Sequence, residues 1–340
     1  MVIGIATARP ILELIDTPED SIELAIVYLR IYFAGMPFLM LYNFGSAILR
    51  SVGDTKRPLY CLVLGGVINI GLNLLLVIVF KLSVVGVGVA TVISNAISSG
   101  IIVYLLTHED EMIRLDLKKL YIKKEDLVKI TQIGAPAGLQ GMVFSISNVC
   151  IQSAINGFGT HAVAGSSAAM NFEYVTFFMV NAFGQAAVTF ISQNYAARKY
   201  ERCKKALGIC VLCGLLISGA MCAVFIYWKE FFVGIFTSKS EDIAYGVIRM
   251  VKVELLEFMP VFYEITGGAL RGMGHSMLPA VLTIFGTCVL RIAWIYTIFP
   301  KFGSFEILLD VYPVTWLVTG IFMCIAYFYI SRKAFRCGKL

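Results

Sequence analysis

Three glutamates lie in one long apolar segment, from about residue 241 to residue 271: Glu254, Glu257 and Glu264. An ionisable side chain inside a lipid bilayer costs several kcal/mol, so each one needs a function or a partner. Glu257 and Glu264 are seven residues apart and share one face of a helix, and Pro260 between them allows a bend. Carboxylates at a bent, buried helix could release and rebind protons or offer oxygens to sodium. We therefore interpret all three as candidate ion-coupling groups.

A structural ion pair is the alternative role for one of these acids. Arg291 lies fourteen residues from one end of the next apolar segment, and Glu257 lies about as far from the matching end of its own. At about 1.5 Å per residue, both side chains would be roughly 21 Å deep, which predicts a pair between them. No basic residue matches the depth of Glu264, which is therefore predicted to couple ions. Glu254 has Lys252 nearby as an alternative partner.

Amide side chains form a stripe on another apolar segment, 127–156. Asn148, Gln152 and Asn156 follow one another at intervals of four residues, the spacing of one helix face. Such a stripe could line a wet cavity that contacts varied small molecules, or it could hydrogen-bond neighbouring helices together. We predict a cavity, whose further candidates are Gln140, Asn171, Glu173 and Tyr174.

Other chemistries lack their residue patterns. The three histidines, His108, His161 and His275, are not at metal-ligand spacing, and the nine cysteines are scattered, mostly in apolar runs. The sequence contains no G-x-x-x-x-G-K-[ST] phosphate-binding loop. We therefore expect no metal site, no cofactor, no nucleotide and no enzyme activity.

The composition is that of a protein that crosses the membrane several times. Hydrophobic residues make up 59% and charged residues 15% of the 340-residue chain. A bilayer is crossed by about 20 apolar residues in a helix. Segments of that length occur at about 21–49, 58–80, 83–107, 127–156, 162–192, 204–228, 241–271, 277–299 and 310–331, with a shorter one at 1–15.

Basic residues are concentrated in alternate connections between these segments. Nineteen lysines and arginines fall on one side, and only Lys81, Lys229, Lys239 and Lys301 fall on the other. The rich side is predicted to be cytoplasmic, which places the carboxyl terminus inside the cell and the protein in the plasma membrane. The net charge of +6 is thus a topology signal, and we expect no nucleic-acid partner.

The chain repeats itself at the scale of half the protein. Arg50, Gly53 and Pro58 return as Arg271, Gly274 and Pro279 at a constant offset of 221 residues. Each copy reads as a helix that ends at a glycine turn on the cytoplasmic face. A repeat of apolar segments indicates a two-lobed membrane transporter. The polar stretch 108–126 is the predicted linker between a first lobe, 1–107, and a second, 127–340.

Several short motifs in this order and spacing resemble the multidrug and toxic compound extrusion (MATE) family. The residues that carry the resemblance are Tyr28–Ile31, Gly35–Pro37, Ile48–Pro58, Ile68–Asn69, Val85–Thr91, Gly134–Gln140, Asn156–Gly159, Phe190–Asn194, Ala269–Gly274 and Tyr312–Trp316. The resemblance implies an all-α protein of twelve helices in two six-helix lobes, related by a pseudo-twofold axis. It implies a monomeric antiporter that exports small amphipathic or cationic compounds against a proton or sodium influx, by rocking of the lobes.

The chain departs from that pattern in its first lobe. The apolar segments correspond to a complete second lobe, whereas the first lacks about two and a half helices, roughly 95 residues by the repeat. We therefore expect an amino-terminally truncated member whose residues 1–340 alone export nothing. The family pattern Asn-x-x-x-Asp has an amide at both positions in this chain, Asn69 and Asn73. We therefore interpret both side chains as cavity candidates without an ion-coupling role. Two alternatives stay open: a lipid-linked precursor flippase, which should have a more basic cavity, and a non-transporting remnant.

Overall fold

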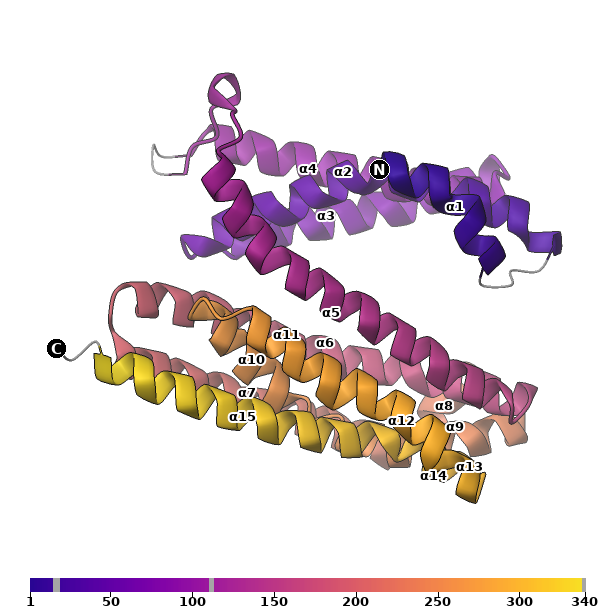
Figure 1. Ribbon diagram of the computed structural model, residues 1–340. Helices are drawn as coiled ribbons and strands as arrows, with labels where there is room; N and C mark the ends of the chain where they lie inside the picture. The colour runs from indigo at the N-terminus through magenta and orange to yellow at the C-terminus, as the bar shows by residue number, and fades with distance from the viewer. Residues whose placement is uncertain (15–18, 110–112, 338–340) are drawn as a thin grey trace. The chain divides into compact units, whose positions relative to one another are not determined.

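The computed structural model describes residues 1–14, 19–109 and 113–337, and these form helices joined by short turns, with no strand among them. The chain divides into two compact units, Met1–Tyr121 and Ile122–Leu340. The division falls inside the polar stretch 108–126 that the sequence suggests as a linker. Each unit has a core of its own, so each is described by itself (Figure 1).

The amino-terminal unit is built on two long helices. Helix α2 (Glu19–Ser51) packs along α4 (Ser83–Thr107), and α3 (Lys56–Asn73) with its π-helical extension η1 (Leu74–Val79) packs on α4. Helix α1 (Val2–Leu14) lies against α2, and the 3₁₀ turn η2 (Leu117–Lys119) precedes the end of the unit. The core residues are Tyr42, Leu49, Cys61, Ile102 and Leu106.

The carboxyl-terminal unit contains the six predicted membrane segments in order. They are α5 (Lys124–Asn156), α6 (Thr160–Ala196), α7 (Tyr200–Tyr227), the broken segment α9 (Ser240–Lys252) with α10 (Val261–Gly272), the segment α11 (Met277–Thr283), η4 (Ile284–Val289) and α12 (Leu290–Thr297), and α15 (Val311–Cys337). Short helices α8 (Lys229–Gly234), α13 (Phe299–Phe302) and α14 (Phe305–Leu309) form the turns. Helix α6 packs against α7, α9 and α10.

The fourth segment of this unit is broken in its middle. Helix α9 ends at Lys252, the single turn η3 (Glu254–Leu256) follows, and α10 starts at Val261 directly after Pro260. The predicted bend at Pro260 is confirmed, since proline lacks the N–H that would continue the helix ladder. The break places Glu254 and Glu257 on non-helical or tightly wound backbone, whereas Glu264 lies within α10.

Glycines allow α6 to approach this broken segment closely. A Cβ at Gly268 of α10 would lie 2.6 Å from the carbonyl oxygen of Gly184, and one at Gly165 of α6 would lie 2.2 Å from that of Asp242. Helices in membranes gain most of their mutual attraction from such close backbone packing, because lipid offers no hydrophobic driving force.

The repeated glycine turns adopt the same structure in both units. Gly53 and Gly274 have φ of +93° and +89°, a conformation that glycine adopts without steric cost. In each turn the glycine N–H donates to the arginine carbonyl three residues back, at 3.0 Å. The next N–H, of Asp54 or His275, donates to the carbonyl of Leu49 or Leu270. Both are Schellman caps, so the predicted helix ends are confirmed.

Hydrogen bonds to Asp54 connect the first of these caps to α3. Its carboxylate accepts the backbone N–H groups of Lys56 and Arg57, and the Arg57 side chain bridges Asp54 and Glu109. Partial burial opposes ionisation of Asp54, but the hydrogen bonds from Arg57 and Lys56 outweigh it and lower the pKa of this carboxyl.

Seven helices in the described part of the chain are long and apolar enough to cross a membrane: 22–51, 56–79, 83–107, 160–196, 200–227, 277–302 and 305–334. Two further predicted spans, 241–271 and 127–156, do not meet the criteria of length and apolar composition. The first is divided into helices of 13 and 12 residues, and the second, in α5, carries the amide stripe. The fold is an all-helical, multi-pass membrane bundle.

Candidate functional site

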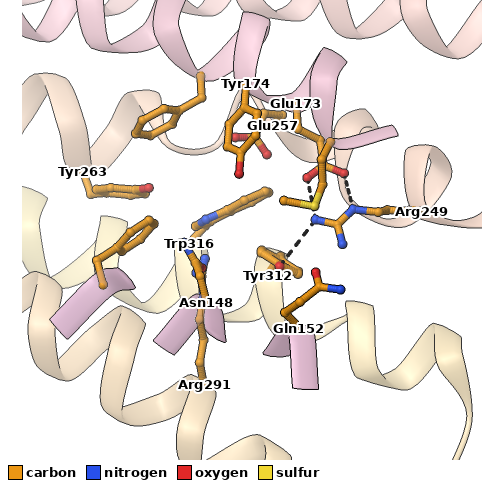
Figure 2. A pocket seen from close by; sticks show the side chains of 13 residues that line it. Asn148, Gln152, Glu173, Tyr174, Arg249, Glu257, Tyr263, Arg291, Tyr312 and Trp316 are labelled. Carbon is orange, nitrogen blue, oxygen red and sulfur yellow. Dashed lines mark hydrogen bonds and ion pairs between the residues drawn. The ribbon is translucent and has the colours of Figure 1, made fainter. Parts of the chain in front are cut away.

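A cavity of about 110 Å³ lies inside the carboxyl-terminal unit (Figure 2). This volume has room for several water molecules. It is smaller than a typical pocket for a whole drug molecule. Six helices and the break before α10 supply its walls. The lining residues are Phe144, Asn148, Gln152, Met170, Glu173, Tyr174, Phe177, Arg249, Glu257, Tyr263, Arg291, Tyr312 and Trp316.

One wall of the cavity is a buried ion pair between α6 and α9. Arg249 donates from Nε to Glu173 Oε1 at 2.6 Å and from Nη2 to Oε2 at 2.8 Å. The two side chains are 1% and 9% exposed, and Arg249 Nη2 also reaches the Tyr312 hydroxyl at 3.5 Å. Planar guanidinium and carboxylate groups match in this two-bond geometry, so Glu173 neutralises Arg249 and ties the two helices together (Figure 2).

The second arginine of the cavity has no carboxylate partner among the described residues. Arg291 donates to Asn148 Oδ1 at 3.0 Å and to Thr315 Oγ1 at 3.4 Å. Its guanidinium carbon lies 4.6 Å from the centre of the Tyr312 ring and 5.2 Å from that of Phe144. Aromatic faces attract cations, so these rings hold the group in place without neutralising its charge.

The predicted ion pair between Glu257 and Arg291 is wrong in this structure. Among the described residues, no nitrogen–oxygen distance within 4.0 Å joins them, although both line the cavity. The prediction rested on equal depths along the two segments. Depth leaves the rotation of each helix undetermined, and Asn148 with the two rings holds Arg291 elsewhere.

The expectation that Glu264 has no basic partner is also wrong. Arg271 Nη2 lies 3.7 Å from Glu264 Oε2, and Glu264 is not among the residues that line the cavity. Side chains on a helix point back towards its amino terminus, and two turns separate the two residues. Arg271 therefore reaches down α10 from the glycine turn at Gly274.

Glu254 and Glu257 differ in their surroundings. Glu254 is fully buried. Its Oε1 accepts a hydrogen bond from Thr176 at 2.7 Å, and its Oε2 has no hydrogen-bond partner in the part of the chain that the structure describes. Lys252, its predicted neighbour, instead bonds to Asp310 at 3.0 Å. Glu257 is 4% exposed, faces the cavity, and receives no hydrogen bond or ion pair from the described residues.

The amide and acid candidates separate into two groups. The cavity is lined by Asn148, Gln152, Glu173 and Tyr174. Asn156 binds Gln152 at 3.0 Å and Asn171 bonds back to its own helix, so these two, with Gln140, lie outside the lining. Asn73 donates to Asn69 within α3, and Asn69 donates to Ser94, which joins α3 to α4 in the other unit. Helix-to-helix bonding, the alternative for amides, is therefore the role of Asn69 in the structure.

Sequence reasoning missed Arg249, which is 1% exposed and therefore as buried as Arg291. It lies in the same apolar segment as Glu254 and Glu257, so the cost of a charge in lipid applies to it equally. Sequence reasoning also missed Thr176, Tyr263 and Trp316, because aromatic and hydroxyl residues are common in membrane helices. No spacing rule distinguishes those that line a cavity.

The charges that line the cavity balance. Glu173 and Glu257 oppose Arg249 and Arg291, and the remaining polar atoms come from amides and phenols. The basic cavity expected for a lipid-linked precursor flippase is therefore not found in this unit.

Comparison with known proteins agrees with this architecture. The MatE family matches residues 1–75 and 136–297. The probable multidrug resistance proteins YoeA and YpnP of Bacillus subtilis are 28% and 30% identical over 84% and 85% of this chain. The chain spans only 63% and 64% of their lengths. An FAD transporter of Shewanella oneidensis is 28% identical over 60% of this chain and 46% of its own.

Solved structures show the same fold. An outward-facing multidrug resistance MATE family transporter superposes on 99% of this chain and 76% of its own, with a TM-score of 0.86 and 22% identity. A MOP superfamily transporter from Pyrococcus furiosus covers 99% of this chain and 75% of its own, with a TM-score of 0.87 and 22% identity. With the family match extending over both units, this chain belongs to the MATE family of multi-pass membrane transporters.

Proposed function

We propose that this chain works in a secondary active exporter that moves small amphipathic or cationic compounds out of the cell in exchange for protons or sodium. Family membership and relatives described as multidrug resistance and multidrug export proteins support an export function. Rocking of one lobe against the other would open the cavity to each side in turn.

The observation that carries the coupling proposal is Glu257. It is the one cavity-lining carboxylate in the described chain that no basic group pairs. An unpaired acid beside water can exchange a proton or hold a sodium ion, and it attracts a cationic substrate when ionised. Glu254, three residues away with a free oxygen, is the second coupling group. Glu264, held by Arg271 outside the cavity, becomes part of a pair near the cytoplasmic end of α10.

The test compares two glutamate-to-glutamine variants in membrane vesicles carrying an imposed proton or sodium gradient. Glu257→Gln is expected to lower gradient-driven efflux of a cationic dye by about tenfold, equivalent to ~1.4 kcal/mol. Glu264→Gln removes an acid from the same broken segment and should retain most of the efflux. Unchanged pumping by Glu257→Gln, or a loss confined to Glu264→Gln, would reject this assignment. Running each gradient separately identifies the ion.

The orientation proposed from charge has its own test. Lys119 is 82% exposed in the linker region, and Lys239 is exposed just before α9. The charge pattern assigns these two residues to opposite sides of the membrane. A cysteine at Lys119 should react with an impermeant thiol reagent only after cells are permeabilised. A cysteine at Lys239, the matched control, should react in intact cells. The reverse labelling pattern would show that the carboxyl terminus is outside.

A further inference from the structure

The segment 117–124, which joins the two units, combines basic and apolar side chains. Its sequence is Leu-Lys-Lys-Leu-Tyr-Ile-Lys-Lys, so four lysines surround a short apolar run. All of these residues are exposed, and the exposed fractions of Leu117, Leu120 and Ile122 are 56%, 65% and 85%. Contact between large apolar side chains and water is unfavourable. An exposed apolar patch with a polar rim indicates a surface that binds something else.

The chain holds this segment close to the ends of two membrane helices. Before it, the Leu115 N–H donates to the carbonyl of Leu106, near the end of α4, at 2.9 Å. Leu115 also packs on the core of the first unit, which includes Leu106. After it, α5 begins at Lys124, and its predicted membrane segment begins at residue 127. The segment therefore lies within a few residues of the bilayer at both of its ends.

The 3₁₀ turn η2 separates apolar from basic side chains. Positions three residues apart eclipse in such a turn, so Leu117 and Leu120 project in the same direction. Asp116 caps the turn by accepting the backbone N–H of Lys118 at 3.0 Å. Lys119 is 82% exposed and lies 3.5 Å from the half-exposed carboxylate of Asp116. Exposed pairs of this kind contribute little free energy, so Lys119 can exchange its partner for another anion.

A second basic connection in the chain lacks the apolar part. The segment 198–205 carries five lysines and arginines, but none of the large exposed hydrophobic residues of the described chain lies within it. Positive charge alone follows from the topology of a membrane protein. The combination of exposed lysines and exposed apolar side chains at 117–124 therefore requires a further explanation.

We infer that the segment 117–124 is an interfacial anchor that binds anionic phospholipids. Its lysines pair with the phosphate and other acidic oxygens of the headgroups, and Leu117, Leu120 and Ile122 insert where the headgroups meet the acyl chains. Neutral phospholipids offer the same apolar layer without net negative charge, so the lysines produce a preference for anionic ones. The anchor ties the connection between the two units to one leaflet, which the proposed export function does not require.

Hydrogen exchange of the full chain in lipid nanodiscs tests this inference. One set of nanodiscs contains phosphatidylcholine, and the other contains equal parts of phosphatidylcholine and phosphatidylglycerol in both leaflets, so the proposed orientation does not affect the result. Amide exchange in 117–124 should slow about tenfold or more in the anionic nanodiscs, equivalent to ~1.4 kcal/mol. The segment 198–205 reports the general effect of a charged surface and should slow much less. Equal slowing of both segments, or no slowing of 117–124, overturns the inference.

Three double variants separate the two parts of the anchor. Lys118→Gln with Lys119→Gln should lose most of the additional slowing, because each lysine near an anionic surface contributes about fivefold. Leu120→Ser with Ile122→Ser keeps all four lysines and should also lose most of it. The matched control, Lys199→Gln with Lys205→Gln, removes two exposed lysines elsewhere and should leave exchange in 117–124 unchanged. Full slowing in the first variant would show that the lysines do not bind lipid, and full slowing in the second would show that nothing is inserted.

Discussion

Replacing Glu173 with glutamine is expected to destabilise the carboxyl-terminal unit by about 3–5 kcal/mol, the cost of stranding a buried charge. Arg249 is 1% exposed and receives its only carboxylate contacts in the described chain from Glu173. Glutamine keeps the size of the side chain and removes its charge. The loss should appear as a lower melting temperature of the detergent-solubilised protein.

Two further variants separate this cost from a general effect of charge removal. Lys252→Gln removes a cation whose partner Asp310 is about one-third exposed, and should cost about 1 kcal/mol or less. The double change Glu173→Gln with Arg249→Met removes the stranded charge and should recover much of the stability. A small loss in Glu173→Gln, similar to that in Lys252→Gln, would mean that water reaches Arg249 and that the pair is not structural.

A single methyl group at Gly165 is expected to separate α6 from α9. The new Cβ would lie 2.2 Å from the Asp242 carbonyl oxygen and 2.7 Å from the Gly246 nitrogen, both backbone atoms that cannot rotate away. Gly165→Ala should therefore cost about 1–3 kcal/mol or more, measured as a lower melting temperature. The strain would also displace Arg249, which lies one turn beyond Gly246 in α9.

The matched control for Gly165→Ala is Gly219→Ala in α7. No heavy atom lies within 4 Å of a Cβ built there. Because alanine is the better helix former, this variant should be neutral or up to about 1 kcal/mol more stable. Equal melting temperatures for the two alanine variants would contradict the close approach of α6 and α9.

The membrane segments and their ends could be predicted from the sequence because both depend on local chemistry. Apolar runs of bilayer length predict helices, and those in the carboxyl-terminal unit appear in the expected order. Gly53 and Gly274 adopt the left-handed conformation at equivalent places, since a Schellman cap depends only on the few residues around it. Pro260 breaks its segment for an equally local reason.

The partners of the charged groups were decided by the tertiary structure. Sequence position predicted depths for Glu257, Glu264 and Arg291, but a contact also requires that two helix faces turn towards each other. That rotation follows from packing of the whole bundle, including the close glycine contacts of α6. As a result Arg291 meets Asn148 and two rings, and Glu264 meets Arg271. Glu257 is left facing the cavity without an ion-pair partner among the described residues.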